Sequence, residues 1–85
     1  MCVLLDEQLD RRLKRLFDAH FVVRTVEEQG WKGKKNGELL RLAEVEFDVF
    51  ITMDKSIEYQ QNLAALQLGI ILLSAKTNRY QDIAP

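Results

Sequence analysis

The sequence predicts an α/β fold, a three-layer α/β/α sandwich around a small four-stranded parallel sheet. Three observations support this fold class. Four short stretches are rich in apolar and β-branched residues, the segments between them have helical periodicity or turn composition, and the connections are short. Parallel strands that are covered on both faces are almost uniformly apolar, and their crossovers carry helices.

The four expected strands are residues 2–5, 21–26, 49–52 and 69–74. The first and the last are nearly uninterrupted apolar runs, and the second contributes β-branched and aromatic side chains. Because crossovers are right-handed, such a sheet commonly has the strand order 2-1-3-4, in which the winding reverses between the first and third strands. Ligands of open α/β sheets bind at the carboxyl ends of the strands at that point.

Helices are expected between the strands. Residues 8–19 place leucines at helical spacing on one side and basic residues on the other. A second helix covers residues 39–47, with Asn36 as its N-cap and Glu38 as a first-turn acid. A third helix is expected over residues 56–67 and begins with a capping serine.

The length of 85 residues fits one domain, and we expect residues 1–85 to form it. A domain of this size has a thin core, and a four-stranded sheet leaves apolar surface exposed, so association into homodimers is expected. Few residues follow the fourth strand, which predicts that a C-terminal helix is missing or truncated.

Charge and cysteine content narrow the class of protein. With 12 Lys and Arg against 13 Asp and Glu, the chain lacks the basic excess of a protein that coats DNA. Cys2 is the single cysteine, and no zinc-binding pattern or leader is recognisable, so a cytoplasmic location is expected. The longest apolar run, residues 70–73, is far shorter than a membrane span.

Acidic residues follow two of the expected strands. Asp6 follows the first strand and Asp54 the third, and these two strands are neighbours in the predicted order. Glu7 and Glu38 are expected close to them. Carboxylate oxygens without histidine or cysteine nearby favour a hard cation, Mg²⁺ or Mn²⁺. The sequence therefore predicts metal-assisted hydrolysis of a nucleic-acid backbone.

Each of these residues also has a structural explanation. Asp6 alone is better explained as a cap of the first helix, and Asp54 alone as the start of a turn. The two acids together, at adjacent strand ends, favour the metal site. For Asn36 helix capping is the better explanation, while Glu38 fits either role equally.

Basic and aromatic residues supply the expected nucleic-acid contacts. Arg12, Arg15 and Lys55 are expected to contact phosphates, although a solvated helix face is the commoner explanation of a basic stripe. Trp31, in a loop rich in glycine and lysine, is expected either to stack on a base or to anchor that loop. His20 is assigned no catalytic role.

Three segments of the chain resemble a known family. They are "VLLDEQL", "GWKGKKNGELLRLAE" and "DVFITMDKSIEYQQNL". From Val3 to Leu73 the chain is similar, in order and without large gaps, to the short PIN-like family of small bacterial and archaeal proteins. That family is related to PIN-domain ribonucleases and to the toxins of VapBC-type toxin–antitoxin pairs. The resemblance implies a reduced PIN-like fold, an RNA substrate, a small antitoxin partner and a Mg²⁺ or Mn²⁺ site built from acids.

The resemblance also implies roles for single residues. The family's first acid falls on Asp6 and the acid after its "T-x-D" strand falls on Asp54, which makes these two the principal metal ligands and catalytic residues. The acid at the start of the family's second long helix falls on Asn36, so the site loses a charge and the amide would orient a metal-bound water. Glu38 is the nearest substitute as a catalytic residue and ligand, with Glu7 as a secondary ligand.

Two other classes of protein stay open. One is a catalytically degenerate PIN-like domain that only binds a partner. The other is a phosphoacceptor receiver-like domain, which has acids after its first and third strands, as this chain does with Asp6, Glu7 and Asp54. A receiver-like domain also needs a lysine after a fifth strand, and no fifth strand is expected.

Overall fold

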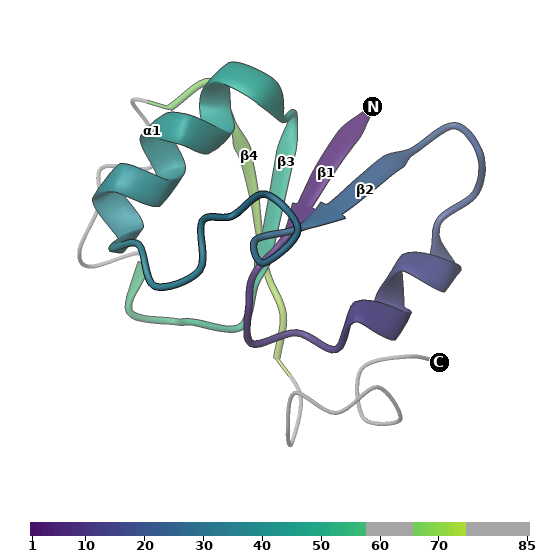
Figure 1. Ribbon diagram of the computed structural model, residues 1–85, viewed down its shortest axis with the longest axis horizontal. Helices are drawn as coiled ribbons and strands as arrows, with labels where there is room; N and C mark the ends of the chain where they lie inside the picture. The colour runs from purple at the N-terminus through teal and green to yellow at the C-terminus, as the bar shows by residue number, and fades with distance from the viewer. Residues whose placement is uncertain (58–65, 75–85) are drawn as a thin grey trace.

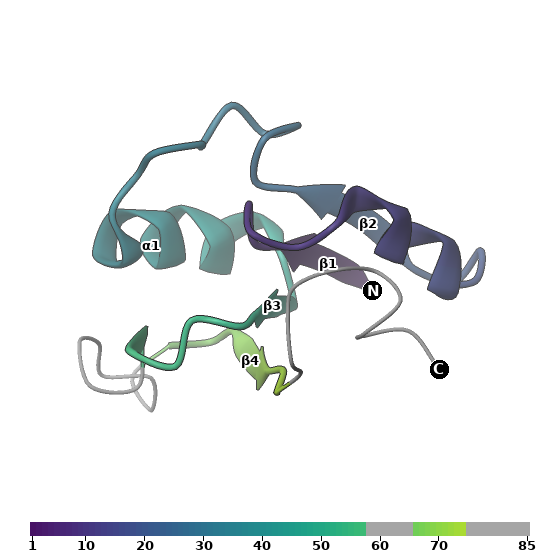
Figure 2. The ribbon, with the colours of Figure 1, turned by 90° about the horizontal axis from the view of Figure 1, so that it is seen from below.

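Four parallel strands form a single sheet in the computed structural model, which describes residues 1–57 and 66–74 (Figure 1). The strands are β1 (Cys2–Leu5), β2 (Val22–Thr25), β3 (Val49–Thr52) and β4 (Gly69–Leu72). Their order is β2-β1-β3-β4, and a second view shows them in this succession (Figure 2). The α/β class, the parallel sheet and the strand order are therefore confirmed.

The strand boundaries agree with the prediction for β1 and β3, whereas β2 and β4 are shorter than expected. After β2 the backbone N–H of Val26 still donates to the Leu5 carbonyl, but the chain then turns. This turn ends at Gly30, whose φ of +76° favours glycine. The turn therefore stops β2 one residue earlier than the apolar pattern does.

The helix α1 (Asn36–Glu46) covers one face of the sheet. Its buried residues, Leu39, Leu40 and Ala43, belong to the same cluster as Leu4 of β1 and Phe50 of β3. The spacing of these side chains on α1 is that of one helical face, as the sequence predicted. The helix thus carries its first turn to the carboxyl ends of β1 and β3.

The structure corrects the prediction for the first helix. An α-helix was expected over residues 8–19, but the structure has a six-residue 3₁₀ helix, η1 (Arg11–Leu16). Asp10 sets its start because the Asp10 carboxylate accepts a hydrogen bond from the backbone N–H of Arg12. The backbone becomes extended again at Phe17. Short 3₁₀ segments are common connectors, and here the helix links two adjacent strands.

The core lies on both faces of the sheet. Leu4 points to the α1 side, whereas its neighbours Val3 and Leu5 pack with Leu9 and Leu13 from the η1 side. This alternation explains why β1 is apolar at every position. Asp6 is the first residue after β1, so its side chain lies at the edge of this apolar core and is largely shielded from water.

Parts of two predictions fall outside the described residues. The expected third helix lies mostly on residues 58–65, and the truncated C-terminal segment on residues 75–85. Within the part that is described, no helix has the length and apolar character needed to cross a bilayer.

Candidate metal and nucleic-acid site

Asp6 follows β1 directly and is held against β3. Its backbone N–H donates to the Ile51 carbonyl at 2.9 Å, which continues the sheet by one residue. One carboxylate oxygen accepts a hydrogen bond from the Thr52 hydroxyl at 2.5 Å, and the other from the Glu7 N–H at 2.8 Å. Only 7% of Asp6 is exposed. Asp6 does not cap η1, a role that Asp10 has, so the capping explanation of Asp6 is wrong.

Burial raises the pKa of Asp6 above its usual value of 3.8. The hydrogen bonds from Thr52 and from the Glu7 N–H oppose this rise, and the negative charges of Glu7 and Asp54 add to it. The ionised form of this carboxylate is therefore costly in the folded protein. A cation that binds at Asp6 would relieve that cost.

Asp54 lies two residues beyond β3 and is joined to Asp6 through Thr52. The Thr52 hydroxyl, which donates to Asp6, accepts the backbone N–H of Asp54 at 3.0 Å. One Asp54 carboxylate oxygen accepts hydrogen bonds from the hydroxyl and the N–H of Ser56, at 2.6 and 3.0 Å. The other accepts from the Asn36 amide at 3.2 Å. These bonds, led by the Ser56 hydroxyl, lower the pKa of Asp54.

Asn36 is the first residue of α1 and not its N-cap, which corrects the sequence prediction. Lys35 occupies the N-cap position and makes no side-chain cap. The Asn36 side chain turns instead to the Asp54 carboxylate. The hydrogen bonds thus connect Asp6, Asp54 and Asn36, which come from the ends of β1 and β3 and the start of α1.

The other predicted acids are placed differently. The Glu38 carboxylate forms an ion pair with Lys34 at 2.9 Å, and this lysine lowers the pKa of Glu38. No bond connects Glu38 to Asp6 or Asp54 in the part of the chain described. Glu7 is exposed, and its contact with Asp6 is through its backbone N–H.

The acids at the two strand ends are oxygen donors, the ligand type that a hard cation prefers. Among residues 1–57 and 66–74, no three His, Cys, Asp or Glu side chains are grouped so that they could share a metal ion. Mg²⁺ commonly binds proteins through one or two carboxylates and keeps several waters. The Asp6 and Asp54 carboxylates with the Asn36 amide are compatible with that mode of binding.

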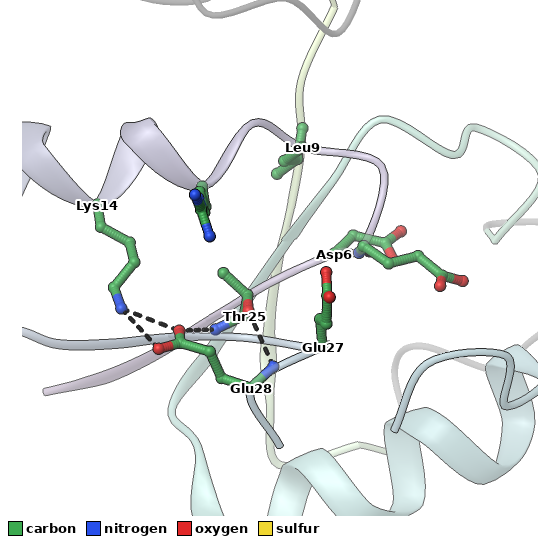
Figure 3. A pocket seen from close by; sticks show the side chains of 8 residues that line it. Asp6, Leu9, Lys14, Thr25, Glu27 and Glu28 are labelled. Carbon is green, nitrogen blue, oxygen red and sulfur yellow. Dashed lines mark hydrogen bonds and ion pairs between the residues drawn. The ribbon is translucent and has the colours of Figure 1, made fainter. Parts of the chain in front are cut away.

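A pocket of about 350 Å³ opens beside Asp6, between η1 and the end of β2 (Figure 3). Two cations of η1, Arg11 and Lys14, line one side of it. Leu9 adds an apolar contact. The rest of the lining consists of Asp6, Glu7, Thr25, Glu27 and Glu28. The Thr52 hydroxyl, bonded to both the Asp6 carboxylate and the Asp54 N–H, is called the Thr52 bridge below. Asp6 therefore takes part in this bridge and also lines the pocket.

A reciprocal pair of hydrogen bonds shapes the β2 side of the pocket. The Glu28 N–H donates to the Thr25 hydroxyl and the Glu28 carboxylate accepts from the Thr25 N–H, the arrangement of a capping box. The same carboxylate binds Lys14 at 2.9 Å, as Figure 3 shows, and Lys14 lowers the pKa of Glu28. The ion pair ties η1 to the turn after β2.

The basic residues at the pocket differ from those predicted. Arg12 forms an ion pair with Asp10 at 2.7 Å, which lowers the pKa of Asp10 to about 2. Arg15 and Lys55 are exposed, and neither lines the pocket. Arg11 and Lys14 belong to the basic face that the sequence predicted for residues 8–19, and they, rather than Arg12 and Arg15, line the pocket. In a 3₁₀ helix residues i and i+3 share one side, which places Arg11 and Lys14 together.

The remaining predictions concern Trp31 and His20. The Trp31 ring packs edge-to-face on Phe47 with the centroids 6.0 Å apart, and Trp31 contacts the α1-side core. Anchoring of its loop is therefore the explanation that the structure supports. The His20 side chain is 91% exposed and lies near Asp18, outside the site.

Comparison with known proteins finds no similar protein or family. No protein-family model matches the sequence, and no curated protein or solved structure matches it significantly. The resemblance to the short PIN-like family stays a prediction.

Proposed function

We propose that this protein is a Mg²⁺- or Mn²⁺-dependent ribonuclease of PIN-like type, the toxin of a toxin–antitoxin pair. The observation that carries the proposal is the Thr52 bridge. It joins the buried Asp6 to Asp54 at the carboxyl ends of β1 and β3, where open α/β sheets bind ligands. The proposal includes the finer part of the predicted fold, a three-layer sandwich of PIN-like type.

Asp6 and Asp54 are the proposed principal ligands of the metal. A divalent cation held there would supply a nucleophilic water and would neutralise charge on the scissile phosphate. Asp54 is kept ionised by Ser56 and Asn36, which makes it a ready anionic ligand. Asn36 orients Asp54 from the first turn of α1. Glu7, whose backbone N–H binds Asp6, is the nearest candidate for a secondary ligand.

The proposed partners follow from the same hypothesis. They are an RNA substrate, a small antitoxin protein and a second copy of the chain, all in the cytoplasm. Sedimentation equilibrium over a range of protein concentrations measures the self-association. A neighbouring gene for a small antitoxin-like protein would support the toxin assignment.

The decisive experiment is a Mn²⁺ titration by calorimetry, together with a cleavage assay on structured RNA. The wild type is expected to bind Mn²⁺ and to cleave, and Asp6→Asn and Asp54→Asn are expected to lose both properties. Asp18→Asn is the matched control, since Asp18 is an exposed acid outside the site. Absence of Mn²⁺ binding by the wild type would contradict the nuclease proposal.

A second candidate is a degenerate domain that only binds a partner. It is favoured by one observation: the Asp54 carboxylate already accepts three hydrogen bonds from Ser56 and Asn36, while Glu38 is bound to Lys34. Retained antitoxin binding without Mn²⁺ binding would select this candidate. Transfer of phosphate from acetyl phosphate to Asp54 would instead select the receiver-like class.

A further inference from the structure

We propose that the pocket between η1 and β2 binds one ribonucleotide unit of a single-stranded RNA. In this proposal the backbone phosphate binds Arg11 and the ribose 2′-hydroxyl donates to the Glu27 carboxylate. The inference rests on the proposed function, because Asp6 is shared between the pocket and the proposed metal site. It adds the residues that would distinguish RNA from DNA.

The size and position of the pocket suit a nucleotide. Its volume of about 350 Å³ lies at the lower end of the range of about 300–1,000 Å³ that is usual for small-molecule sites. Asp6 lies at one end of the lining and Lys14, on η1, at the other. A nucleotide seated between them would place its neighbouring phosphodiester at the Thr52 bridge.

The η1 side of the pocket supplies one available cation. Lys14 is engaged by Glu28, so its charge is largely compensated within the protein. Arg11 is exposed and lies near the Asp10 carboxylate, but Asp10 pairs with Arg12, and within the described residues Arg11 forms no side-chain hydrogen bond or ion pair. The planar guanidinium of arginine binds phosphate oxygens in pairs, which gives both affinity and orientation. Arg11 is therefore the expected phosphate ligand.

The opposite side of the pocket carries a hydrogen-bond acceptor and so suits a ligand that donates a hydrogen bond. In Figure 3 the Glu27 carboxylate is directed to the side of the pocket where Asp6 lies. Unlike Glu28, it has no ion-pair partner in the part of the chain that is described. A carboxylate repels phosphate but accepts a hydrogen bond from a hydroxyl. The 2′-hydroxyl is the donor that RNA has and DNA lacks.

The test compares RNA and DNA binding by fluorescence anisotropy. The probes are fluorescein-labelled octauridylate and the octadeoxyuridylate of the same sequence, measured in EDTA and again with Ca²⁺. The variants are Arg11→Gln and Glu27→Ala. Arg24→Gln is the control with the same charge change: Arg24 is exposed on β2 and in register with Leu4, so it faces the α1 side.

Arg11→Gln is expected to weaken binding of both probes about tenfold and to lower the salt dependence by about one phosphate contact. Glu27→Ala is expected to reduce the preference for RNA to near unity without weakening DNA binding. Arg24→Gln should bind as the wild type does. Equal affinity of the wild type for both probes would overturn the inference, and so would a wild type that binds RNA under neither condition.

The two proposals fail in different ways. RNA binding that depends on Arg11 and Glu27, without any Mn²⁺-dependent cleavage, would support the pocket and contradict the nuclease. Mn²⁺-dependent cleavage with unchanged affinity and RNA preference in both variants would support the nuclease and contradict the pocket. Thermal unfolding of each variant checks that both exposed substitutions preserve the fold.

Discussion

Two aspartates at neighbouring strand ends have opposite environments. Asp6 is buried and its pKa is raised, whereas Asp54 accepts hydrogen bonds from Ser56 and Asn36 and its pKa is lowered. Carboxylates whose pKa values are pushed apart in this way are typical of functional sites. Structural networks also perturb pKa values, so substitutions at these residues are the useful test.

We predict that Asp6→Asn changes the pH dependence of stability. Because folding raises the pKa of Asp6 above 3.8, the folded state binds more protons than the unfolded state between these two values. The stability that protonated Asp6 contributes is complete below 3.8 and is lost as the pH rises through the raised pKa. The asparagine variant lacks this loss, so its free energy of unfolding should rise relative to that of the wild type over this range.

Urea unfolding of both proteins from about pH 4 to pH 8 measures this difference. The exposed substitution Asp18→Asn serves as the control for general effects of charge removal. A difference between Asp6→Asn and wild type that stays constant with pH would contradict the raised pKa of Asp6.

We predict that Asn36→Asp strengthens Mn²⁺ binding. The substitution places a second carboxylate next to the Asp54 oxygen that now accepts the amide at 3.2 Å. Two like charges repel, so the metal-free variant should be less stable than the wild type, and Mn²⁺ should bind about tenfold more tightly. Asn36→Ala removes the amide without adding charge. Equal Mn²⁺ affinity of the two variants in calorimetry would contradict a metal site here.

At the scale of elements, the end of β3 couples the two acids. Thr52 is fully buried, donates to Asp6 and accepts from the Asp54 N–H. Its hydroxyl is therefore bonded on both sides, and no other side chain is bonded to both acids within the described residues. The geometry of the site depends on the register in which β1 and β3 pair.

We predict that Thr52→Val destabilises the protein by about 1–3 kcal/mol, because it leaves buried polar groups without partners. It should also raise the pKa of Asp6 further and weaken Mn²⁺ binding, since the hydroxyl stabilises the ionised carboxylate. Thr25→Val is the matched control at the end of β2. It should cost about 1 kcal/mol by breaking the capping box with Glu28, and leave Mn²⁺ affinity unchanged. Equal loss of Mn²⁺ affinity in both variants would contradict a specific bridge.

At the scale of the whole molecule, stability depends on one thin core on each face of the sheet. Phe50 lies on β3, one of the two central strands, and is completely buried in the α1-side cluster. We predict that Phe50→Ala costs about 3–5 kcal/mol, a large part of the about 5–10 kcal/mol expected for a small domain. Val45→Ala, at a position 82% exposed on α1, should change stability by less than about 0.5 kcal/mol. Urea unfolding of both variants compares these costs.

The sequence by itself determined the class of fold, the strand order and the two acids at the strand ends. Apolar runs identify buried parallel strands because such strands must be apolar on both faces. Right-handed crossovers then leave few topologies, so Asp6 and Asp54 were expected at neighbouring strand ends before any contact was known.

Only the tertiary structure decided which side chains surround those acids. Of the basic residues on η1, Arg11 and Lys14 line the pocket, whereas Arg12 pairs with Asp10 and Arg15 is exposed away from it. Asn36 does not cap α1 as predicted, because its side-chain amide donates a hydrogen bond to the Asp54 carboxylate instead. These outcomes depend on contacts between residues far apart in the chain, which local periodicity and capping preferences do not contain.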